Sequence, residues 1–121
     1  MLEHRGRSSG LIRQVVLETV AREGESRIVV SGYGWSAQWL RNVIADPRVR
    51  LWAGSRRGRS ARAEVLDAEE AVEVLEHYRR RHRSAARVLG RALDLADLRV
   101  DDPLPLDVAL RLPVVRITPT R

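Results

Sequence analysis

The chain has 121 residues, of which 44% are hydrophobic, so it is long enough to form one domain with its own core. It has no cysteine, which excludes disulfides and thiolate chemistry. It has no apolar run approaching the roughly 18 residues of a membrane span and no apolar leader after Met1. These features predict a cytoplasmic protein without a signal peptide or an integral membrane segment. All 22 basic residues are arginine and the net charge is +6, which excludes Schiff-base lysine chemistry and favours an anionic ligand.

The positive charge is concentrated in the first half of the chain, where it accompanies a glycine-rich motif. Residues 1–62 carry twelve arginines against five acids, a net charge of +7, whereas residues 63–121 carry ten against eleven, a net charge of −1. The first half includes Arg5-Gly6-Arg7-Ser8-Ser9-Gly10, followed by Arg13. Glycine allows backbone N–H groups to approach a ligand, and arginine binds phosphate through two parallel donors. The motif therefore predicts a site for a phosphate-bearing molecule.

Three segments at the start of the chain have the composition of β-strands. Residues 2–5 fit a short first strand, Gln14–Val20 is rich in β-branched side chains, and Ser26–Ser31 contains the apolar run of a strand that is buried on both faces. Gly24 lies in a turn between the last two segments, which are therefore predicted to form a hairpin.

A helix is predicted after this hairpin. Ser31-Gly32-Tyr33-Gly34 breaks the strand, Ser36 has the residue type of an N-cap, and Asp46-Pro47 ends the helical pattern. A strand that turns into a helix through glycines presents free backbone N–H groups, so this crossing is a second candidate for ligand binding. The apolar residues at helical spacing in this segment are Trp39, Leu40, Val43 and Ile44.

The second half predicts another hairpin and then helices. Alternating apolar and polar residues predict strands over 48–53 and 59–66, joined by a turn at Gly54–Gly58. Asp67 and Glu70 have the spacing of a capping box at the start of the next helix. Its predicted inner face consists of Ala71, Val72, Leu75 and Tyr78, and that of a following helix of Ala85, Val88, Leu89, Ala92 and Leu93.

A loop at 101–105 and a strand at Pro113–Thr118 complete the predicted elements. Two hairpins and a late returning strand fit a small antiparallel barrel with helices packed outside. The sequence thus predicts an α+β fold, mainly β, formed by a single domain over residues 1–121. Three histidines and no cysteine give no metal-ligand pattern, so no metal site is expected.

Four motifs in this order resemble those of the deazaflavin-dependent nitroreductase and quinone reductase family. They are Gly6–Arg13, the strand end Ser31-Gly32, the helical Trp39-Leu40-Arg41-Asn42 and the segment Ala45–Val49. The closing Leu112-Pro113-Val114-Val115 is similar to the last strand of that family. The resemblance covers nearly the whole chain and implies a split β-barrel of the FMN-binding type.

The resemblance also implies an activity and a set of site residues. The implied activity is hydride transfer from reduced coenzyme F-420, an 8-hydroxy-5-deazaflavin, to a quinone, nitro compound or enone. Arg7, Ser8, Ser9, Gly10 and Arg13 would hold the phosphate and acidic tail of the coenzyme. Ser31, Gly32, Tyr33 and Gly34 would line the ring, Trp39 and Asn42 would close the site, and Ser31 is the candidate for polarising the acceptor.

The residues alone leave several alternatives open. Arg7 and Arg13 could be solvated charges, Ser8 and Ser9 turn residues, and Trp39 a core residue of an amphipathic helix. The chain also departs from the family pattern, because Ser8 stands where many members have lysine. The segment 82–88 contains no tyrosine where the acceptor site of well-known members has several.

Two other functions remain possible from sequence. One is an FMN, haem or deazaflavin binder without efficient turnover. The other is a nucleic-acid-binding module, which the basic first half favours and the lack of a helix-turn-helix or RNA-binding signature disfavours. FMN ends in a single phosphate, whereas the deazaflavin coenzyme carries an acidic extension that many arginines would favour. The expected partners are the cofactor and a small acceptor, in a monomer or a homodimer.

Overall fold

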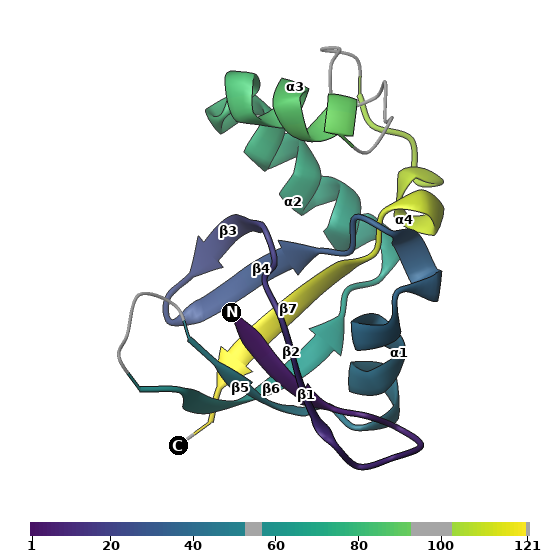
Figure 1. Cartoon of the computed structure of the whole chain (residues 1–121). Helices are drawn as coiled ribbons and strands as arrows, with labels where there is room; N and C mark the ends of the chain where they lie inside the picture. The colour runs from purple at the N-terminus through teal and green to yellow at the C-terminus, as the bar shows by residue number, and fades with distance from the viewer. Residues whose placement is uncertain (53–56, 93–102, 121) are drawn as a thin grey trace.

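A computed structural model describes residues 1–52, 57–92 and 103–120. Its centre is a curled antiparallel sheet of seven strands in the order β2-β1-β5-β6-β7-β4-β3 (Figure 1). The sheet confirms the mainly β, barrel-like fold predicted from the sequence. The strands are β1 (Leu2–Arg5), β2 (Ile12–Val15), β3 (Thr19–Glu23), β4 (Ser26–Val30), β5 (Arg48–Leu51), β6 (Arg59–Val65) and β7 (Val114–Pro119).

The helices lie outside this sheet, as expected. The helix α1 follows a 3-10 turn and contacts β1 and β6, whereas α2, α3 and α4 pack at the other end of the molecule (Figure 1). None of the described helices is long and apolar enough to span a membrane. The helical elements are η1 (Gly34–Ser36), α1 (Gln38–Ala45), α2 (Ala68–Arg81), α3 (Arg83–Ala92) and α4 (Val108–Arg111).

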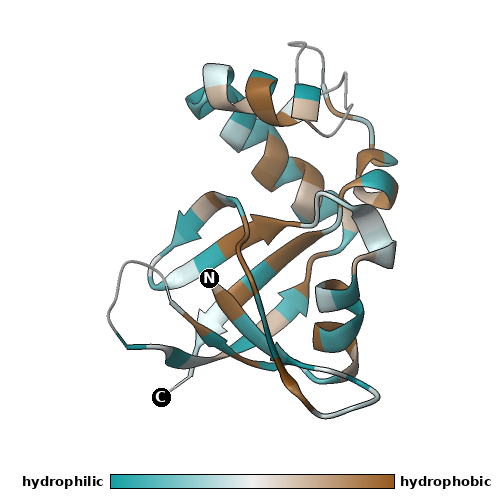
Figure 2. Ribbon diagram, viewed as in Figure 1, coloured by the Kyte–Doolittle hydropathy of each residue, from teal (hydrophilic) through white to brown (hydrophobic). Residues whose placement is uncertain are grey.

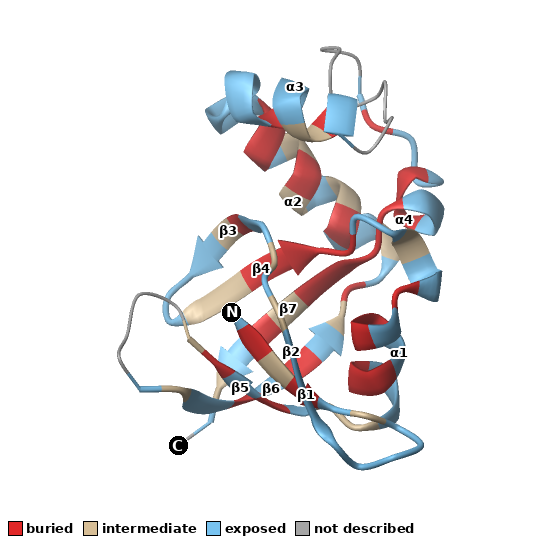
Figure 3. Cartoon of the chain, in the orientation of Figure 1, coloured by how far each residue is buried: buried red, intermediate tan, exposed pale blue. Residues whose placement is uncertain are grey.

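The sheet separates two apolar clusters, because successive side chains of a strand point to opposite faces. Ile28 and Val30 of β4 contact the cluster under α2 and α4, whereas Val29 contacts the cluster beneath α1. The prediction that β4 is buried on both faces is therefore confirmed. Figure 2 shows apolar residues along β4 and β7, and Figure 3 shows the same strands largely buried.

Two sequence predictions about boundaries are wrong. The single strand predicted at Gln14–Val20 is two strands, because β2 pairs with β1 whereas β3 pairs with β4. Ser36 does not cap α1: it ends the 3-10 turn, and the helix begins at Gln38 after Ala37, without a side-chain cap. The division of Gln14–Val20 could not be seen locally, since it is decided by pairing with β1 and β4.

The second half agrees more closely with expectation. Asp67 caps α2 by accepting a hydrogen bond of 2.9 Å from the Glu70 backbone N–H. The predicted face of α3 is right only for Leu89, which packs against the core, because Ala86 and Gly90 are buried whereas Val88 is 65% exposed. The short helix α4 was not predicted. The predictions for Ala53, for most of the Gly54–Gly58 turn, for Leu93 and for residues 101 and 102 lie outside the described residues.

Candidate functional site

The glycine-rich motif forms the tip of the β1–β2 hairpin. Gly10 has φ of +71°, a conformation that L side chains rarely adopt, and its N–H donates to the Gly6 carbonyl at 2.8 Å. A Cβ on Gly6 would lie 2.6 Å from the Ser9 hydroxyl oxygen, which itself accepts from the Leu11 N–H. Gly10 is therefore favoured by its backbone conformation, whereas a side chain at Gly6 would displace the Ser9 hydroxyl from its place in the loop.

This loop leaves polar donors available. Among the described residues, the backbone N–H groups of Ser8 and Ser9 have no hydrogen-bond partner, and neither has the Arg13 guanidinium. Arg13 lies directly across the hairpin from His4, so both side chains are on the same face of the sheet. The loop thus offers backbone donors, and Ser8, Ser9 and Arg13 line the same cavity.

The helix α1 holds the loop through Asn42. The Asn42 Oδ1 accepts from the Arg7 backbone N–H at 3.1 Å and from the Arg7 Nη1 at 2.8 Å. One turn earlier, Gln38 Oε1 accepts from Arg7 Nη2 at 2.8 Å. Two amides spaced four residues apart therefore orient one guanidinium and leave its remaining N–H groups able to bind a ligand.

Asn42 also contacts His4. Its Nδ2 lies 3.1 Å from the His4 Nδ1, and both side chains are about 5% exposed. Because the Asn42 amide nitrogen can only donate, His4 accepts through Nδ1 and is neutral, with its proton on Nε2. Burial, assisted by the charge of Arg13, lowers the pKa of His4, which agrees with this assignment.

These residues surround a cavity of about 450 Å³. Of the predicted cofactor residues, Arg7, Ser8, Ser9, Arg13 and Asn42 line it. Gly6, which also lines it, belongs to the predicted phosphate motif, and the lining residues that sequence reasoning missed are His4 and Gln38. Gln38 and Asn42 share a helix face, and His4 alternates with the buried Leu2. Those spacings are the signals that could have indicated them.

The second predicted segment lies apart from this cavity. The Ser31 hydroxyl is buried and donates to the Gly34 carbonyl at 2.7 Å, which closes a turn in which Gly34 has φ of +73°. Gly32 is exposed, and Tyr33 is 90% exposed. Trp39 is buried in the apolar cluster beneath α1, so its packing role is settled whereas a ligand role is not.

The donors fit a phosphate group. The cavity lining contains two arginines, two serines and no carboxylate, and Gly6 keeps the loop close-packed. Backbone N–H groups, hydroxyls and guanidinium groups together form the donor set that binds phosphate oxygens. No group of three or more histidine, aspartate or glutamate side chains in the described part of the chain is arranged to hold a metal.

The sequence matches one family model along most of its length. The model, described as F420H(2)-dependent quinone reductase, matches residues 1–102. That span includes the Gly6–Arg13 loop, the Ser31–Gly34 turn and all of α1. No curated protein matches the sequence significantly.

Solved structures share the fold at low sequence identity. A structure of an F420-H2-dependent reductase, FDR-A, matches with a TM-score of 0.61 at 21% identity, over 96% of this chain and 90% of that chain. A structure described as a domain-swapped dimer has a TM-score of 0.61 at 20% identity, over 96% and 76%. A conserved hypothetical protein from Mycobacterium tuberculosis has a TM-score of 0.52 at 16% identity, over 99% and 71%. These similarities establish the split-barrel fold.

Proposed function

The chain belongs to the F420H(2)-dependent quinone reductase family, and on that premise we propose how its residues hold the coenzyme and what kind of acceptor it reduces. It is an oxidoreductase with coenzyme F420 as its cofactor. The chemistry that the bound coenzyme supplies is hydride donation from C5 of the deazaflavin ring. The proposed acceptor is a quinone, with nitro compounds and enones as alternatives of similar electron demand.

The observation that carries the proposal is the set of hydrogen bonds that holds the Arg7 side chain. Asn42 and Gln38 fix its guanidinium, while the free N–H groups of Ser8 and Ser9 lie in the adjacent loop. A preorganised guanidinium loses little entropy when it binds a phosphate oxygen. We therefore place the coenzyme phosphate at this loop, with Arg13 as the second cation.

The Ser31–Gly34 turn is proposed to face the deazaflavin ring. Tyr33 is the exposed aromatic side chain of this turn and can cover a planar ring. Ser31 is proposed to shape the turn through its hydrogen bond to Gly34. A role in polarising the acceptor would require that hydrogen bond to break, and it stays a prediction. Trp39 is proposed to contribute indirectly, because its packing in the apolar cluster beneath α1 fixes the position of that helix.

Binding of F420 and of FMN in parallel tests the cofactor assignment. We expect F420 to bind with higher affinity than FMN, and Arg7→Ala to weaken F420 binding by about tenfold or more, because a charge-assisted hydrogen bond contributes roughly 1.5–3 kcal/mol. Arg87→Ala, on the exposed face of α3, removes the same charge away from the loop and serves as the matched control. Equal binding of FMN, or an Arg7→Ala affinity equal to that of Arg87→Ala, would contradict the site.

Turnover separates an enzyme from a binding protein of the same fold. With reduced F420 and a soluble quinone, the wild-type chain should oxidise the coenzyme catalytically, and Ser31→Ala tests the polarisation role directly. A large loss of kcat with unchanged protein stability would support polarisation, whereas a parallel loss of both would indicate that Ser31 only shapes the turn. A cytoplasmic location and a monomeric or homodimeric state remain proposals beside this one.

A further inference from the structure

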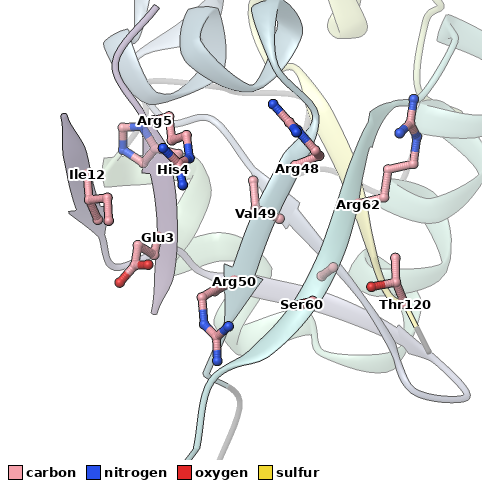
Figure 4. A pocket seen from close by; sticks show the side chains of 11 residues that line it. Glu3, His4, Arg5, Ile12, Arg48, Val49, Arg50, Ser60, Arg62 and Thr120 are labelled. Atoms are coloured by element: carbon pink, nitrogen blue, oxygen red, sulfur yellow. The ribbon is translucent and has the colours of Figure 1, made fainter. Parts of the chain in front are cut away.

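The outer edge of strand β2 is exposed and apolar. β2 is an outer strand of the sheet, and among the described residues it pairs only with β1. Leu11, Ile12 and Val16 are each more than half exposed, and Val16 is 84% exposed. Figure 4 shows Ile12 at the margin of a cavity of about 470 Å³, on the face that it shares with Glu3 and Arg5 of β1. We call the free side of residues 11–17 the β2 edge.

The opposite edge of the sheet is protected in ways that the β2 edge is not. β3 has a register shift between Thr19 and Ala21 and contacts α2, and it carries two charged side chains near its end, Arg22 and Glu23. Bulges, charges and a covering helix keep edge strands from pairing with other chains. β2 shows no register shift against β1, contains no proline and has a single charged residue, Arg13. Of these two edges, β2 is therefore the one open to a further strand.

The backbone groups that face the β2 edge follow from the β1–β2 register. Opposed residues of an antiparallel pair alternate between hydrogen-bonded and non-hydrogen-bonded positions. The Gly6 N–H donates to the Leu11 carbonyl at 2.8 Å, and this pair continues the β1–β2 register. Leu11 and every second residue after it therefore direct their N–H and C=O groups to β1. Ile12, Gln14 and Val16 direct theirs to the free edge.

We propose that the β2 edge pairs with the β2 edge of a second copy of this chain, antiparallel and centred on Gln14. A two-fold axis at Gln14 lets the two Gln14 backbones exchange hydrogen bonds and places Ile12 opposite Val16 of the second copy. On the other face of the sheet, Leu11 lies opposite Leu17 of the second copy. Each exposed apolar side chain of the β2 edge thus meets an apolar partner, and such cross-strand pairs stabilise a sheet.

The neighbouring registers are less favourable. A two-fold axis at Arg13 would place two guanidinium groups directly opposite each other, which destabilises a sheet, and would pair Ile12 with Gln14. An axis at Val15 would place Ile12 opposite the carboxylate of Glu18. The sequence of the edge is therefore self-complementary in the register centred on Gln14.

This pairing also brings the second copy to the candidate site. Arg13 lines the cavity next to the Gly6–Arg13 loop, and in the proposed register it lies opposite Val15 of the second copy. The apolar segment of the second copy therefore borders the cavity beside Arg13. The inference goes beyond the proposed function and does not depend on which molecule binds in that cavity.

Charge substitutions at the paired positions test the dimer and its register. We expect the average mass of the wild type in sedimentation equilibrium to rise from one chain towards two with concentration, because so short an edge buries less than the roughly 1,600 Å² of a standard interface. I12R/V16R places like charges opposite each other and should weaken the dimer by about tenfold or more. I12E/V16R places opposite charges at the same positions and should restore it at low salt. Far-UV circular dichroism verifies that both variants are folded.

A single cysteine at the two-fold axis gives an independent test. The chain has no cysteine, so an interchain disulfide in Gln14→Cys can form only between the two introduced thiols. Opposed residues of a hydrogen-bonded antiparallel pair have Cα atoms about 5.5 Å apart, which a disulfide can span. Gln14→Cys should therefore cross-link under mild oxidation much faster than Arg22→Cys, an exposed position on the opposite edge of the sheet.

Each outcome decides the inference. A wild type that stays monomeric at about 1 mM, where even a weak complex forms, would overturn the β2 pairing. So would a dimer that I12R/V16R leaves unchanged, or cross-linking of Arg22→Cys in preference to Gln14→Cys, which would assign the dimer to β3. Failure of I12E/V16R to restore a dimer that I12R/V16R has lost would overturn the register. Coenzyme binding enters none of these measurements, so their result is independent of the proposed function.

Discussion

At the scale of single residues, Asn42 connects the parts of the candidate site. It joins β1, the glycine loop and α1 through hydrogen bonds to His4 and Arg7, and it is buried. A substitution that removes the Asn42 amide would leave buried hydrogen-bonding groups of its partners unpaired. Each such group costs roughly 1–3 kcal/mol, so this position tolerates few substitutes. The role of Asn42 is thus to orient binding groups.

His4 makes the stability of the protein dependent on pH. Burial and Arg13 lower the pKa of His4 in the native state, so the unfolded chain binds the proton more tightly. The stabilisation from the neutral side chain is therefore complete above the unfolded pKa of about 6.5 and is lost as the pH falls below it. Urea unfolding between about pH 7 and pH 5 should show a decreasing free energy of unfolding.

His4→Gln provides the matched comparison. Its side-chain oxygen can accept from Asn42, and it has no proton to gain in this pH range. We expect the free energy of unfolding of His4→Gln to change less between those pH values than that of the wild type. A wild-type slope that persists unchanged in the variant would assign the pH dependence to other groups.

At the scale of elements, the Gly6–Arg13 loop depends on its backbone conformation to position its donors. Gly10 has φ of +71°, and a Cβ there would meet no atom within 4 Å, so Gly10→Ala introduces backbone strain without a steric clash. We expect a loss of about 1 kcal/mol in the free energy of unfolding and weaker F420 binding, because the strained loop shifts the Ser8 and Ser9 N–H groups.

Gly24 provides the control for this prediction. It lies in the β3–β4 turn with φ of +58°, and a Cβ there would also meet no atom within 4 Å. It does not line the cavity next to the Gly6–Arg13 loop. Gly24→Ala should therefore cost similar stability and leave F420 affinity unchanged. If the two variants bound F420 equally well, the loop conformation would not matter for binding.

The elements also show how far the sequence can be interpreted. The start of α2 follows from Asp67 and Glu70 because a cap is a local interaction between residues three positions apart. The division of Gln14–Val20 into two strands depends on pairing with β1 and β4, which no local pattern encodes. Likewise, the buried face of α3 is set by its contacts with α2.

At the scale of the whole molecule, the site combines parts of the chain that only folding brings together. Arg7 and Asn42 are 35 positions apart, and His4 and Asn42 are 38 apart. Family motifs indicated Arg7 and Asn42 as site residues, but the residues alone could not show that one orients the other. His4 and Gln38 carried no motif, so their part in the network emerged only from the packing of α1 on β1.

The helical and β parts of the molecule are also linked by charge. Arg116 on β7 contacts Glu23, Glu64 and Glu70, which come from β3, β6 and α2, at 3.0–3.1 Å. The hydrogen bonds to Glu70 and Glu23 raise the pKa of Arg116, and its side chain is 22% exposed. A single guanidinium thus keeps three carboxylates from repelling one another.

Arg116→Gln should therefore destabilise the whole fold. We expect a loss of roughly 1–2 kcal/mol in the free energy of unfolding, since three carboxylates are left without their shared cation, and the loss should shrink in high salt. Arg59→Gln breaks a single exposed pair with Glu25 and should change the free energy of unfolding by less than about 0.5 kcal/mol. Equal stability of the two variants would show that the Arg116 network contributes no more than an isolated surface pair. A loss of stability confined to Arg116→Gln, with F420 affinity retained, would show that this network stabilises the fold without contributing to the binding site.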